Sequence, residues 1–317
     1  MAVEPTDKAT SERYAIAIHG GCGTADRLLP ADVQADYRDG LSRALELGRH
    51  LLAEGRSSLE VVEAVARAME DDPLFNAGKG SAFNNQGAHE LDASIMDGRT
   101  MACGAVAGVR TVKNPISLAR LVMQRTDHVL LAGVGAEQFA AQMQVALVDP
   151  DYFYTPRLRA LWAAGDSSNP PRPDLGLSRG TIGVVALDKQ GNLAAATSTG
   201  GTSFKMPGRI GDSPIIGAGT YAKNGVCAIS CTGRGEEFIR HSVAHTVAAL
   251  IEYKQMTLVD AAQEVIDHTL APGVGGIIAV AADGSLALPF NTPAMLRGAA
   301  DASGRFEVAI WDETVSR

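Results

Sequence analysis

The sequence predicts an α+β fold in which two β-sheets stack between layers of helices. Three observations favour this class. Strand patterns lie in the middle of each half of the 317-residue chain, helical patterns cluster between them, and residues 181–188 are apolar on both alternating faces. A strand that is apolar on both faces has to be covered on both sides. We therefore expect two stacked sheets with helices outside them.

The first half of the chain combines two strand patterns with four helical ones. Ser57 and Glu60 form a plausible capping box, which satisfies free N–H groups at the start of a helix. Pro115 suits the first turn of another helix, where its missing N–H has no partner to lose. The expected strands are 14–19 and 90–112, the second broken near Asp97, and the expected helices are 32–53, 57–72, 115–122 and 133–144.

The second half is predicted to begin with a hairpin, because two apolar runs flank the turn at 189–191. Residues 238–251 carry apolar side chains at intervals of three and four, which predicts one amphipathic helix. Asp283 and Gly284 mark the turn of a second hairpin. The expected strands are 181–188, 192–199, 225–231, 277–281, 286–288 and 306–311, and a further helix is expected at 258–270.

Charge and hydropathy exclude several classes of partner. The formal net charge is 28 − 36 = −8, with no block of basic residues, which argues against nucleic acid and against an anionic membrane surface. No stretch approaches the ~20 apolar residues that span a bilayer, and the first residues lack the apolar core of a signal peptide. We expect neither a nucleic acid nor a membrane as partner.

The four cysteines, Cys22, Cys103, Cys227 and Cys231, favour a reducing compartment. Cys227 and Cys231 stand four residues apart in a strand-like run, a spacing that fits neither a zinc ribbon nor a redox pair. Free buried thiols are therefore the preferred interpretation. We expect a cytoplasmic protein.

Thr181 follows a stretch that is rich in turn-forming residues, beginning with 164–173. An apolar strand pattern comes directly after it. A linker that ends on Gly180-Thr181 directly before a buried strand is what a self-cleaving precursor needs. Cleavage would leave Thr181 as a new N-terminus, with its hydroxyl as nucleophile and its own α-amine as base. A Gly-Thr pair alone is typical of ordinary turns, and threonine often opens strands. The prediction therefore depends on further motifs.

Five further motifs occur in order along the chain. They are IHGGCG at 18–23, PLFNAGKG at 73–80, TGG at 199–201, PGRIGDSP at 207–214 and CTGRGEEFIR at 231–240. Together with Thr181 they resemble the plant-type asparaginases, also called isoaspartyl or β-aspartyl peptidases, of the N-terminal nucleophile hydrolase superfamily. The resemblance extends from about Tyr14 to Trp311, nearly the whole chain.

The resemblance implies a four-layer αββα sandwich of the N-terminal nucleophile hydrolase type. Cleavage at Gly180–Thr181 would produce an α-subunit, 1–180, and a β-subunit, 181–317, that remain one folded unit. Residues 1–13 are expected to be disordered and 157–180 to form a flexible linker. The resemblance also implies a dimer of cleaved heterodimers.

The resemblance assigns roles to the catalytic groups. Thr181 would be the nucleophile, and the Thr199 hydroxyl would support it. The Thr232 hydroxyl and the Gly233 N–H would donate to the oxyanion, where each donor is worth ~2.7–4 kcal/mol. Asn76 would help to position the nucleophile. Read alone, Thr199 suits a strand end and Gly233 a strand-to-helix turn.

Arg209 and Asp212 match the family's substrate clamp, to which Thr232 and Gly233 also contribute. A guanidinium offers a planar fork for the α-carboxylate of an aspartyl unit, and Asp212 would accept from the α-amine. Taken alone, these two residues could form an ordinary surface ion pair. An ordinary peptide bond consumes the α-carboxylate, so free L-asparagine and β-aspartyl dipeptides should be cleaved and asparagine within a chain should not. L-Glutamine is one methylene longer, and discrimination of ~1–3 kcal/mol or more is expected.

The resemblance implies no catalytic cofactor and one structural ion. The loop 69–79 resembles one that wraps Na⁺ with backbone carbonyls, which here would belong to Met69, Glu70, Asp72, Phe75, Ala77 and Lys79. The His19-Gly20-Gly21 segment is interpreted as backbone packing near the site, since a lone histidine is more often structural than catalytic.

Two residues depart from the family pattern. Cys22 stands where alanine is frequent, and Arg234 stands where smaller or acidic residues are frequent. Arg234 follows the oxyanion glycine, so we hypothesise that it alters the leaving-group side of the pocket or slows maturation. Two alternatives remain open, a glycosylasparaginase-like amidase and a non-catalytic aspartyl-binding protein. Phosphate binding is disfavoured because no Walker pattern occurs.

Overall fold

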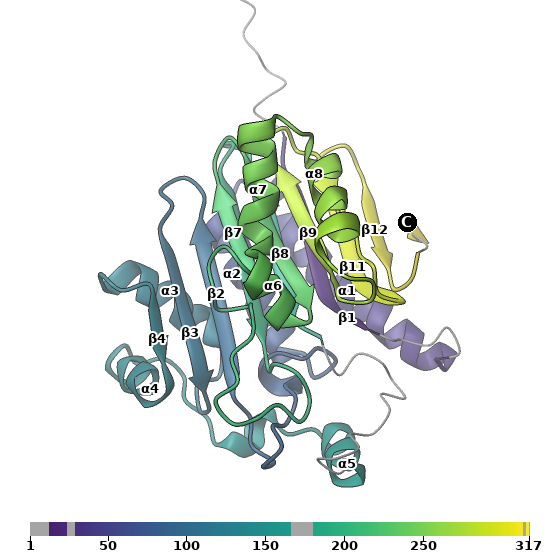
Figure 1. Cartoon of the computed structure of the whole chain (residues 1–317). Coiled ribbons are helices and arrows are strands. Elements are labelled where there is room, and N and C mark those ends of the chain that lie inside the picture. The colour runs from purple at the N-terminus through teal and green to yellow at the C-terminus, as the bar shows by residue number, and fades with distance from the viewer. Residues whose placement is uncertain (1–12, 24–28, 166–179, 313–314, 317) are drawn as a thin grey trace, which may run out of the picture.

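Two β-sheets stack face to face between helices in the computed structural model, which describes residues 13–23, 29–165, 180–312 and 315–316 (Figure 1). The larger sheet has nine strands in the order β13-β12-β11-β1-β5-β6-β2-β3-β4 and is antiparallel except for the β3–β4 pair. Its strands are β1 (Ala15–Gly23), β2 (Leu91–Asp97), β3 (Cys103–Val109), β4 (Leu130–Ala132), β5 (Ile182–Leu187), β6 (Leu193–Thr199), β11 (Ala294–Asp301), β12 (Phe306–Ala309) and β13 (Val315–Ser316).

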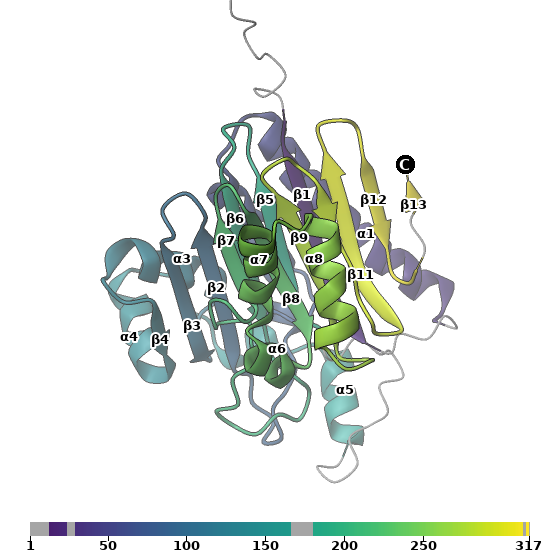
Figure 2. The same ribbon diagram turned by 45° about the horizontal axis from the view of Figure 1, so that its top comes forward.

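The smaller sheet packs on the centre of the larger one. Its order is β10-β9-β8-β7, and its adjacent strands are antiparallel. Figure 2 shows β8 and β9 in front of β5 and β1. The strands are β7 (Thr220–Lys223), β8 (Cys227–Gly233), β9 (Gly275–Ala281) and β10 (Leu286–Ala287).

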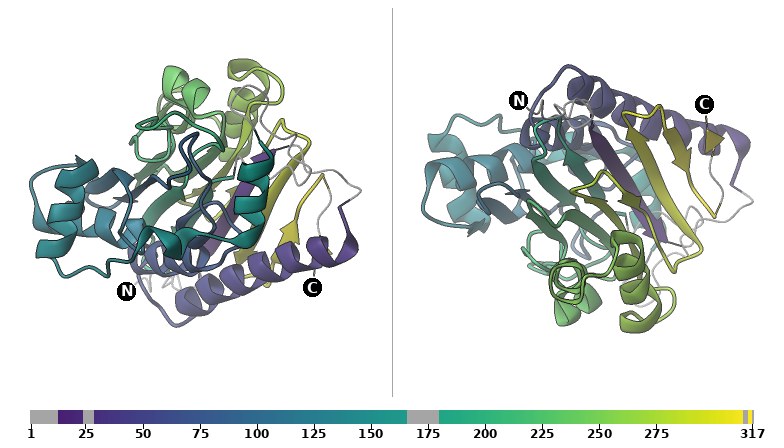
Figure 3. Two further views of the ribbon diagram at one scale, coloured as in Figure 1. Left: turned by 90° about the horizontal axis from the view of Figure 1, so that it is seen from below. Right: turned by 90° about the horizontal axis from the view of Figure 1, so that it is seen from above.

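Helices cover the outer faces of both sheets, which produces the predicted four layers (Figure 3). The face of the nine-stranded sheet is covered by α1 (Ala31–Ala53), α2 (Ser58–Asp71) and α3 (Pro115–Arg125). The other face of the molecule carries α6 (Gly235–His241), α7 (Val243–Lys254) and α8 (Leu258–Glu264), which a π-turn at Val265–Thr269 extends. The remaining helices are α4 (Gly133–Gln142) and α5 (Pro156–Ala164), with 3₁₀ turns at Gly78–Gly80 and Pro150–Phe153. Among the described residues, no helix has both the length and the apolar character needed to cross a membrane.

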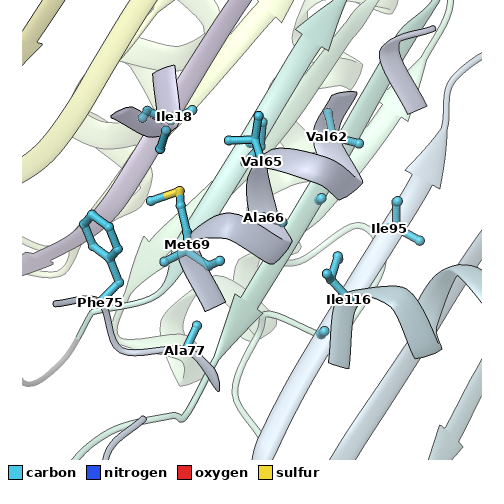
Figure 4. Close-up of a cluster of buried hydrophobic side chains, with 14 of the residues drawn as sticks. Ile18, Val62, Val65, Ala66, Met69, Phe75, Ala77, Ile95 and Ile116 are labelled. Atoms are coloured by element: carbon cyan, nitrogen blue, oxygen red, sulfur yellow. The ribbon is translucent and has the colours of Figure 1, made fainter. Parts of the chain in front are cut away.

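The helix α2 shows how the local sequence becomes packing. The capping box is present, since the Ser57 side chain accepts from the Glu60 N–H and the Glu60 side chain accepts from the Ser57 N–H. The apolar face of the helix then lies against the large sheet, with Val62, Val65 and Met69 fully buried (Figure 4). Full burial of side chains of this size contributes about 1.5–3 kcal/mol each. This packing fixes the end of α2, from which the loop carrying Asn76 starts.

The single helix predicted for 238–251 is wrong, because the chain forms two helices there. Ser242 separates α6 from α7 in a left-handed conformation, with φ of 46°. The N–H groups of Ala244 and His245 donate to the carbonyls of Ala218 and Gly217, at 3.1 and 2.8 Å. These tertiary hydrogen bonds replace the ones that a continuous helix would make, so apolar spacing alone could not reveal the break.

Other differences concern strands and the linker. The strand β11 had no predicted counterpart, although it pairs with β1 along most of its length. The linker predicted for 157–180 begins with a helix instead, because Thr155 caps α5 by accepting from the Leu158 N–H. Residues 166–179 lie outside the described residues, as do residues 1–12 of the segment predicted to be disordered.

Candidate active site

Thr181 lies at the start of β5, a central strand of the large sheet that pairs with β1 and β6. The strand pairing sets Ile182 opposite Ser198, which brings Thr181 beside Thr199 at the end of β6. The Thr181 hydroxyl donates to the Thr199 hydroxyl at 3.1 Å, and both side chains are buried. The structure therefore brings together the predicted nucleophile and its predicted supporting threonine.

The Gly180 carbonyl is held by two side-chain donors. Asn76 Nδ2 donates to the Gly180 oxygen at 2.6 Å, and Thr199 Oγ1 donates to it at 3.3 Å. The amide of Asn76 is fixed at its other end, because its oxygen accepts from the Ala82 N–H at 2.7 Å. Two donors thus face the oxygen that would become negative if the Thr181 hydroxyl attacked the Gly180 carbonyl carbon.

The second glycine of the His19-Gly20-Gly21 segment leaves space for the Gly180–Thr181 peptide bond. Gly21 has a φ of +112°, and a Cβ there would lie 2.4 Å from the Gly180 Cα. A real Cβ would displace the backbone at the predicted cleavage point, so only glycine fits. The predicted interpretation of this segment as backbone packing agrees with the geometry.

The predicted oxyanion donors end strand β8. Thr232 is fully buried, and its Oγ1 has no hydrogen-bond partner in the described part of the chain. Gly233 has a φ of +145°, and a Cβ there would lie 2.3 Å from the Val274 carbonyl oxygen. The strand β8 packs on β5, so the unpaired hydroxyl of Thr232 belongs to the strand that covers the one following Thr181.

Asp212 lies in the loop between β6 and β7 and is 4% exposed. Its Oδ2 has no partner among the described residues. Burial raises the pKa of the carboxyl to about 7, an effect that the nearby Arg209 partly offsets. A Cβ on Gly219 would lie 2.8 Å from Oδ2, and a Cβ on Gly235 would lie 2.8 Å from Oδ1. Each oxygen of Asp212 therefore lies against a glycine that has no room for a side chain, and Oδ2 is buried without a donor in the described part of the chain.

Arg209 pairs with a residue that the sequence did not single out. Its Nε and Nη2 donate to the two carboxylate oxygens of Glu236 at 3.0 and 3.1 Å. The hydrogen bonds from Arg209 hold the pKa of Glu236 below its usual range. Glu236 occupies one edge of the guanidinium and thereby sets its orientation. The only sequence feature that could have indicated Glu236 is its place in the first turn of α6. Acidic residues are common at that position because they stabilise the helix, so the feature does not identify a partner of Arg209.

A second unpredicted group holds the loop that carries Arg209 and Asp212. Lys205 is 4% exposed, and its Nζ donates to the Glu90 carbonyl at 2.7 Å. The Glu90 carboxylate accepts from Arg110 Nη2 at 2.9 Å and from the Gly208 N–H at 3.1 Å. These contacts attach the start of the loop to β2 and β3, far from it in sequence.

The loop after α2 brings several carbonyl oxygens close to two glycines. A Cβ on Gly78 would lie 2.3 Å from the Glu70 oxygen, and a Cβ on Gly80 would lie 2.0 Å from the Phe75 oxygen and 2.8 Å from the Pro73 oxygen. Neither position has room for a side chain, so the backbone of the loop 69–79 packs closely on itself. The described residues contain no group of three or more His, Cys, Asp or Glu side chains that could hold a metal ion.

The two departures from the family pattern lie in different environments. Cys22 is buried, and its Sγ donates to the Thr232 carbonyl at 3.3 Å. Burial raises the pKa of this thiol to about 11, so it is protonated and unreactive. Arg234 is exposed at the turn before α6. A cavity of about 750 Å³ lies elsewhere, between α1 and the β11–β12 turn, and no candidate site residue lines it.

Comparisons with known proteins find asparaginases and isoaspartyl peptidases. A family model described as asparaginase matches residues 12–310. The isoaspartyl peptidase of Salmonella typhimurium is 49% identical over 89% of this chain and 93% of its own length. A probable isoaspartyl peptidase/L-asparaginase 2 of Arabidopsis thaliana is 45% identical over 94% of this chain and 99% of its own. The human isoaspartyl peptidase/L-asparaginase is 39% identical over 95% of this chain and 98% of its own.

Proposed function

This chain belongs to the asparaginase family of N-terminal nucleophile hydrolases, and we propose that it cleaves itself at Gly180–Thr181 and then hydrolyses β-amides. Its substrates are L-asparagine and β-aspartyl dipeptides. The observation that carries the proposal is the hydroxyl of Thr181, buried beside Thr199, with the Gly180 carbonyl oxygen held by Asn76. The names of the relatives do not favour a glycosylasparaginase.

Self-cleavage follows from this arrangement as an N-to-O acyl shift. The Thr181 Oγ attacks the Gly180 carbonyl carbon, and the negative charge on the Gly180 oxygen is stabilised by Asn76 Nδ2 and Thr199 Oγ1. The C–N bond then breaks while the proton lost by the Thr181 hydroxyl passes to the nitrogen, which leaves the Gly180 acyl group as an ester on Thr181 and frees the α-amine. Water hydrolyses the ester, and the Gly180 carboxylate and the Thr181 hydroxyl result.

Hydrolysis of substrate uses the freed α-amine as the base. An α-amine titrates near 7.7–8.0, so it accepts the hydroxyl proton of Thr181 while Oγ attacks the β-amide carbon. The Thr232 hydroxyl and the Gly233 N–H stabilise the oxyanion. The ammonium then protonates the leaving amine as the C–N bond breaks. Water hydrolyses the aspartyl ester and regenerates the enzyme.

Selection of the substrate depends on Arg209 and Asp212. The Nη1 side of the Arg209 guanidinium pairs with the α-carboxylate, while Glu236 holds Nε and Nη2. The free Oδ2 of Asp212 accepts from the α-ammonium. Both α-groups are free in asparagine and in an isoaspartyl linkage but not in a normal peptide. L-Glutamine, longer by one methylene, is discriminated against by ~1–3 kcal/mol or more.

We propose in addition that the loop 69–79 holds Na⁺ through backbone carbonyls, for which its resemblance to the sodium-binding loop of the family is the support. The ion would supply positive charge that stabilises the loop carrying Asn76. Thermal unfolding in NaCl and in choline chloride of equal ionic strength tests this proposal. A Tm that rises with Na⁺ concentration supports it, since a ligand of the native state stabilises by mass action. Equal Tm values in both salts contradict it.

Assembly and compartment follow as further proposals. We propose a dimer of cleaved heterodimers, with a mass of twice the 33.1 kDa of the chain, which light scattering measures. A cytoplasmic location is supported by the cysteines, because all four are free and three are buried.

Denaturing electrophoresis with an activity assay tests the central proposal. The mature protein should show fragments of 180 and 317 − 180 = 137 residues and should release ammonia from L-asparagine and the free amino acid from a β-aspartyl dipeptide. Thr181→Ala should remain one 33.1 kDa chain without activity, whereas Thr181→Ser keeps a hydroxyl and should cleave. An uncut wild-type chain that binds aspartate without hydrolysis would instead show an aspartyl-binding protein.

A further inference from the structure

A chain of four buried hydroxyl groups and one imidazole alternates between the two sheets and ends on the nucleophile residue. Its members are Ser94 on β2, Thr220 on β7, Thr197 on β6, Ser230 on β8 and His19 on β1, all fully buried. The successive distances are 2.8 Å from Ser94 to Thr220, 2.6 Å from Thr220 to Thr197, 2.7 Å from Thr197 to Ser230 and 3.0 Å from Ser230 to His19 Nε2. His19 Nδ1 reaches the Thr181 carbonyl oxygen at 2.8 Å.

The direction of these hydrogen bonds follows from the acceptor at the end. A carbonyl oxygen only accepts, so His19 Nδ1 carries the hydrogen and donates to Thr181. Burial lowers the pKa of His19 to about 3, so the ring is neutral and its Nε2 accepts from Ser230. Ser230 therefore accepts from Thr197, which in turn accepts from Thr220. The hydroxyl protons of Thr220, Thr197 and Ser230 therefore point toward the nucleophile, and the proton of Ser94 is shared between the Ser213 carbonyl and Thr220.

The backbone of the nucleophile strand is shaped to admit this chain. Gly183 lies two residues after Thr181, and a Cβ there would stand 2.1 Å from both His19 Nε2 and Ser230 Oγ. Any other residue at this position would force His19 and Ser230 apart. At Gly183 the two sheets therefore meet through a polar contact between His19 and Ser230. The side chains around this contact, between the two sheets, are apolar.

The other end of the chain reaches the loop of the predicted clamp. Ser94 Oγ lies 2.6 Å from the Ser213 carbonyl oxygen, and Thr220 Oγ1 lies 3.3 Å from the same oxygen. Ser213 directly follows Asp212. One series of hydrogen bonds thus joins the backbone of the nucleophile to the backbone beside the recognition carboxylate.

We propose that Ser94, Thr220, Thr197, Ser230 and His19 form a positioning network that holds Thr181 in place after cleavage and sets its position relative to Asp212. The proposal rests on the proposed function. Cleavage removes the covalent link between Thr181 and Gly180, and a chain terminus is poorly ordered unless other contacts tie it down. The carbonyl of Thr181 is the group by which the network holds it. These five residues act through Thr181 or Ser213.

The experiment compares fully cleaved variants at the two ends and in the middle of the network. Ser230→Ala should lower kcat by about tenfold to a hundredfold with KM nearly unchanged, because small misplacement of a reacting group is costly. Ser94→Ala should mainly raise KM, because it loosens the loop beside Asp212. Thr197→Val should affect both constants, and Thr197→Ser, which keeps the hydroxyl, should restore most of the loss. Mass spectrometry confirms complete cleavage before each assay.

Two further measurements separate positioning from simple structural support. Ser42 is buried in α1, and its hydroxyl has no partner in the described part of the chain, so Ser42→Ala should leave kcat and KM unchanged. The ¹⁵N shift of His19 Nε2 should change in Ser230→Ala, since that atom loses its donor, and the Nδ1 proton should remain.

Unchanged kcat and KM in cleaved Ser230→Ala and Ser94→Ala, whatever their Tm, would overturn the network. Thr197→Ser as slow as Thr197→Val would overturn it too, because the hydroxyl would then be irrelevant. Failure of the proposed function looks different, since the wild-type protein itself would then hydrolyse no β-amide.

Discussion

The two sides of the candidate active site differ in how completely their polar groups are paired. Around Thr181 the side chains of Asn76, Thr199 and His19 all make hydrogen bonds within the chain. On the recognition side, Asp212 Oδ2, Ser213 Oγ and Thr232 Oγ1 are buried without partners among the described residues. A buried polar group left without a partner costs about 1–3 kcal/mol.

The difference reflects what each side acts on first. In the proposed function the first substrate of Thr181 is the Gly180–Thr181 bond, which is part of the chain, so folding itself can complete that side. In the same proposal the side built on Asp212 and Thr232 recognises an external ligand, and its unpaired groups gain partners when an aspartyl unit binds. Folding thus pairs the polar groups around Thr181, whereas the unpaired groups around Asp212 would gain partners from the substrate.

Substitution of Asp212 should separate the two sides most clearly. Asp212→Asn removes the acceptor charge for the α-ammonium, and loss of one partner of a buried charge pair costs about 2–5 kcal/mol. We expect kcat/KM for L-asparagine to fall by roughly a hundredfold to a thousandfold, while self-cleavage proceeds at the wild-type rate. Steady-state kinetics and electrophoresis over time measure the two effects. Loss of cleavage in this variant would show that the two sides are not independent.

The converse change is Asn76→Ala, which removes a donor from the Gly180 carbonyl. Removal of one oxyanion donor costs about 2.7–4 kcal/mol, so self-cleavage should slow by about a hundredfold. Substrate affinity should change little in the molecules that do cleave. The exposed Asn85 offers a matched control, since Asn85→Ala should cleave normally. Cleavage of Asn76→Ala at the wild-type rate would contradict the assigned role.

A smaller effect is expected at the residue that orients the clamp. Glu236→Gln weakens the pairing with Arg209 Nε and Nη2, and because Glu236 is 44% exposed, solvent screens much of the charge. We expect KM to rise by about tenfold with little change in kcat. For a substrate whose α-carboxylate is converted to an amide, the effect should disappear. An equal effect on both substrates would show that Glu236 does not act through Arg209.

The smallest expected effect concerns pH. Burial raises the pKa of Asp212 to about 7, with Glu236 and Asp92 raising it further and Arg209 lowering it. The ionised form binds the α-ammonium, so kcat/KM should fall as pH drops through 7, with about half the free enzyme protonated at that pH. In the complex the substrate ammonium lowers the pKa of Asp212. The pH profile of kcat should therefore lack the fall caused by Asp212 and keep only the fall caused by protonation of the Thr181 α-amine. Identical limbs in both profiles would contradict the assignment.

Local patterns in the sequence were sufficient wherever neighbours along the chain decide the structure. The capping box of Ser57 and Glu60 forms as predicted, because both partners lie within one turn. The hairpin of β5 and β6 likewise follows from its turn. The motifs also indicated Thr181, Thr199, Arg209 and Asp212 as candidates, because each motif is a short segment with its own glycines.

Contacts between distant segments could not be predicted in the same way. Glu236 lies 27 residues from Arg209, and Ser230 lies 211 residues from His19. The break between α6 and α7 is caused by carbonyls of Gly217 and Ala218, which belong to another loop. Nothing in the spacing of apolar residues records such partners.

By itself the sequence determined the layers and gave the candidates for the nucleophile and the clamp, because periodicity and short motifs are properties of residues that lie close together in the chain. Only the tertiary structure decided which polar groups would be paired and which would remain open. That choice depends on the stacking of β8 on β5 and on the course of the loop 200–219, since burial turns an ordinary hydroxyl or carboxylate into a group that needs a partner.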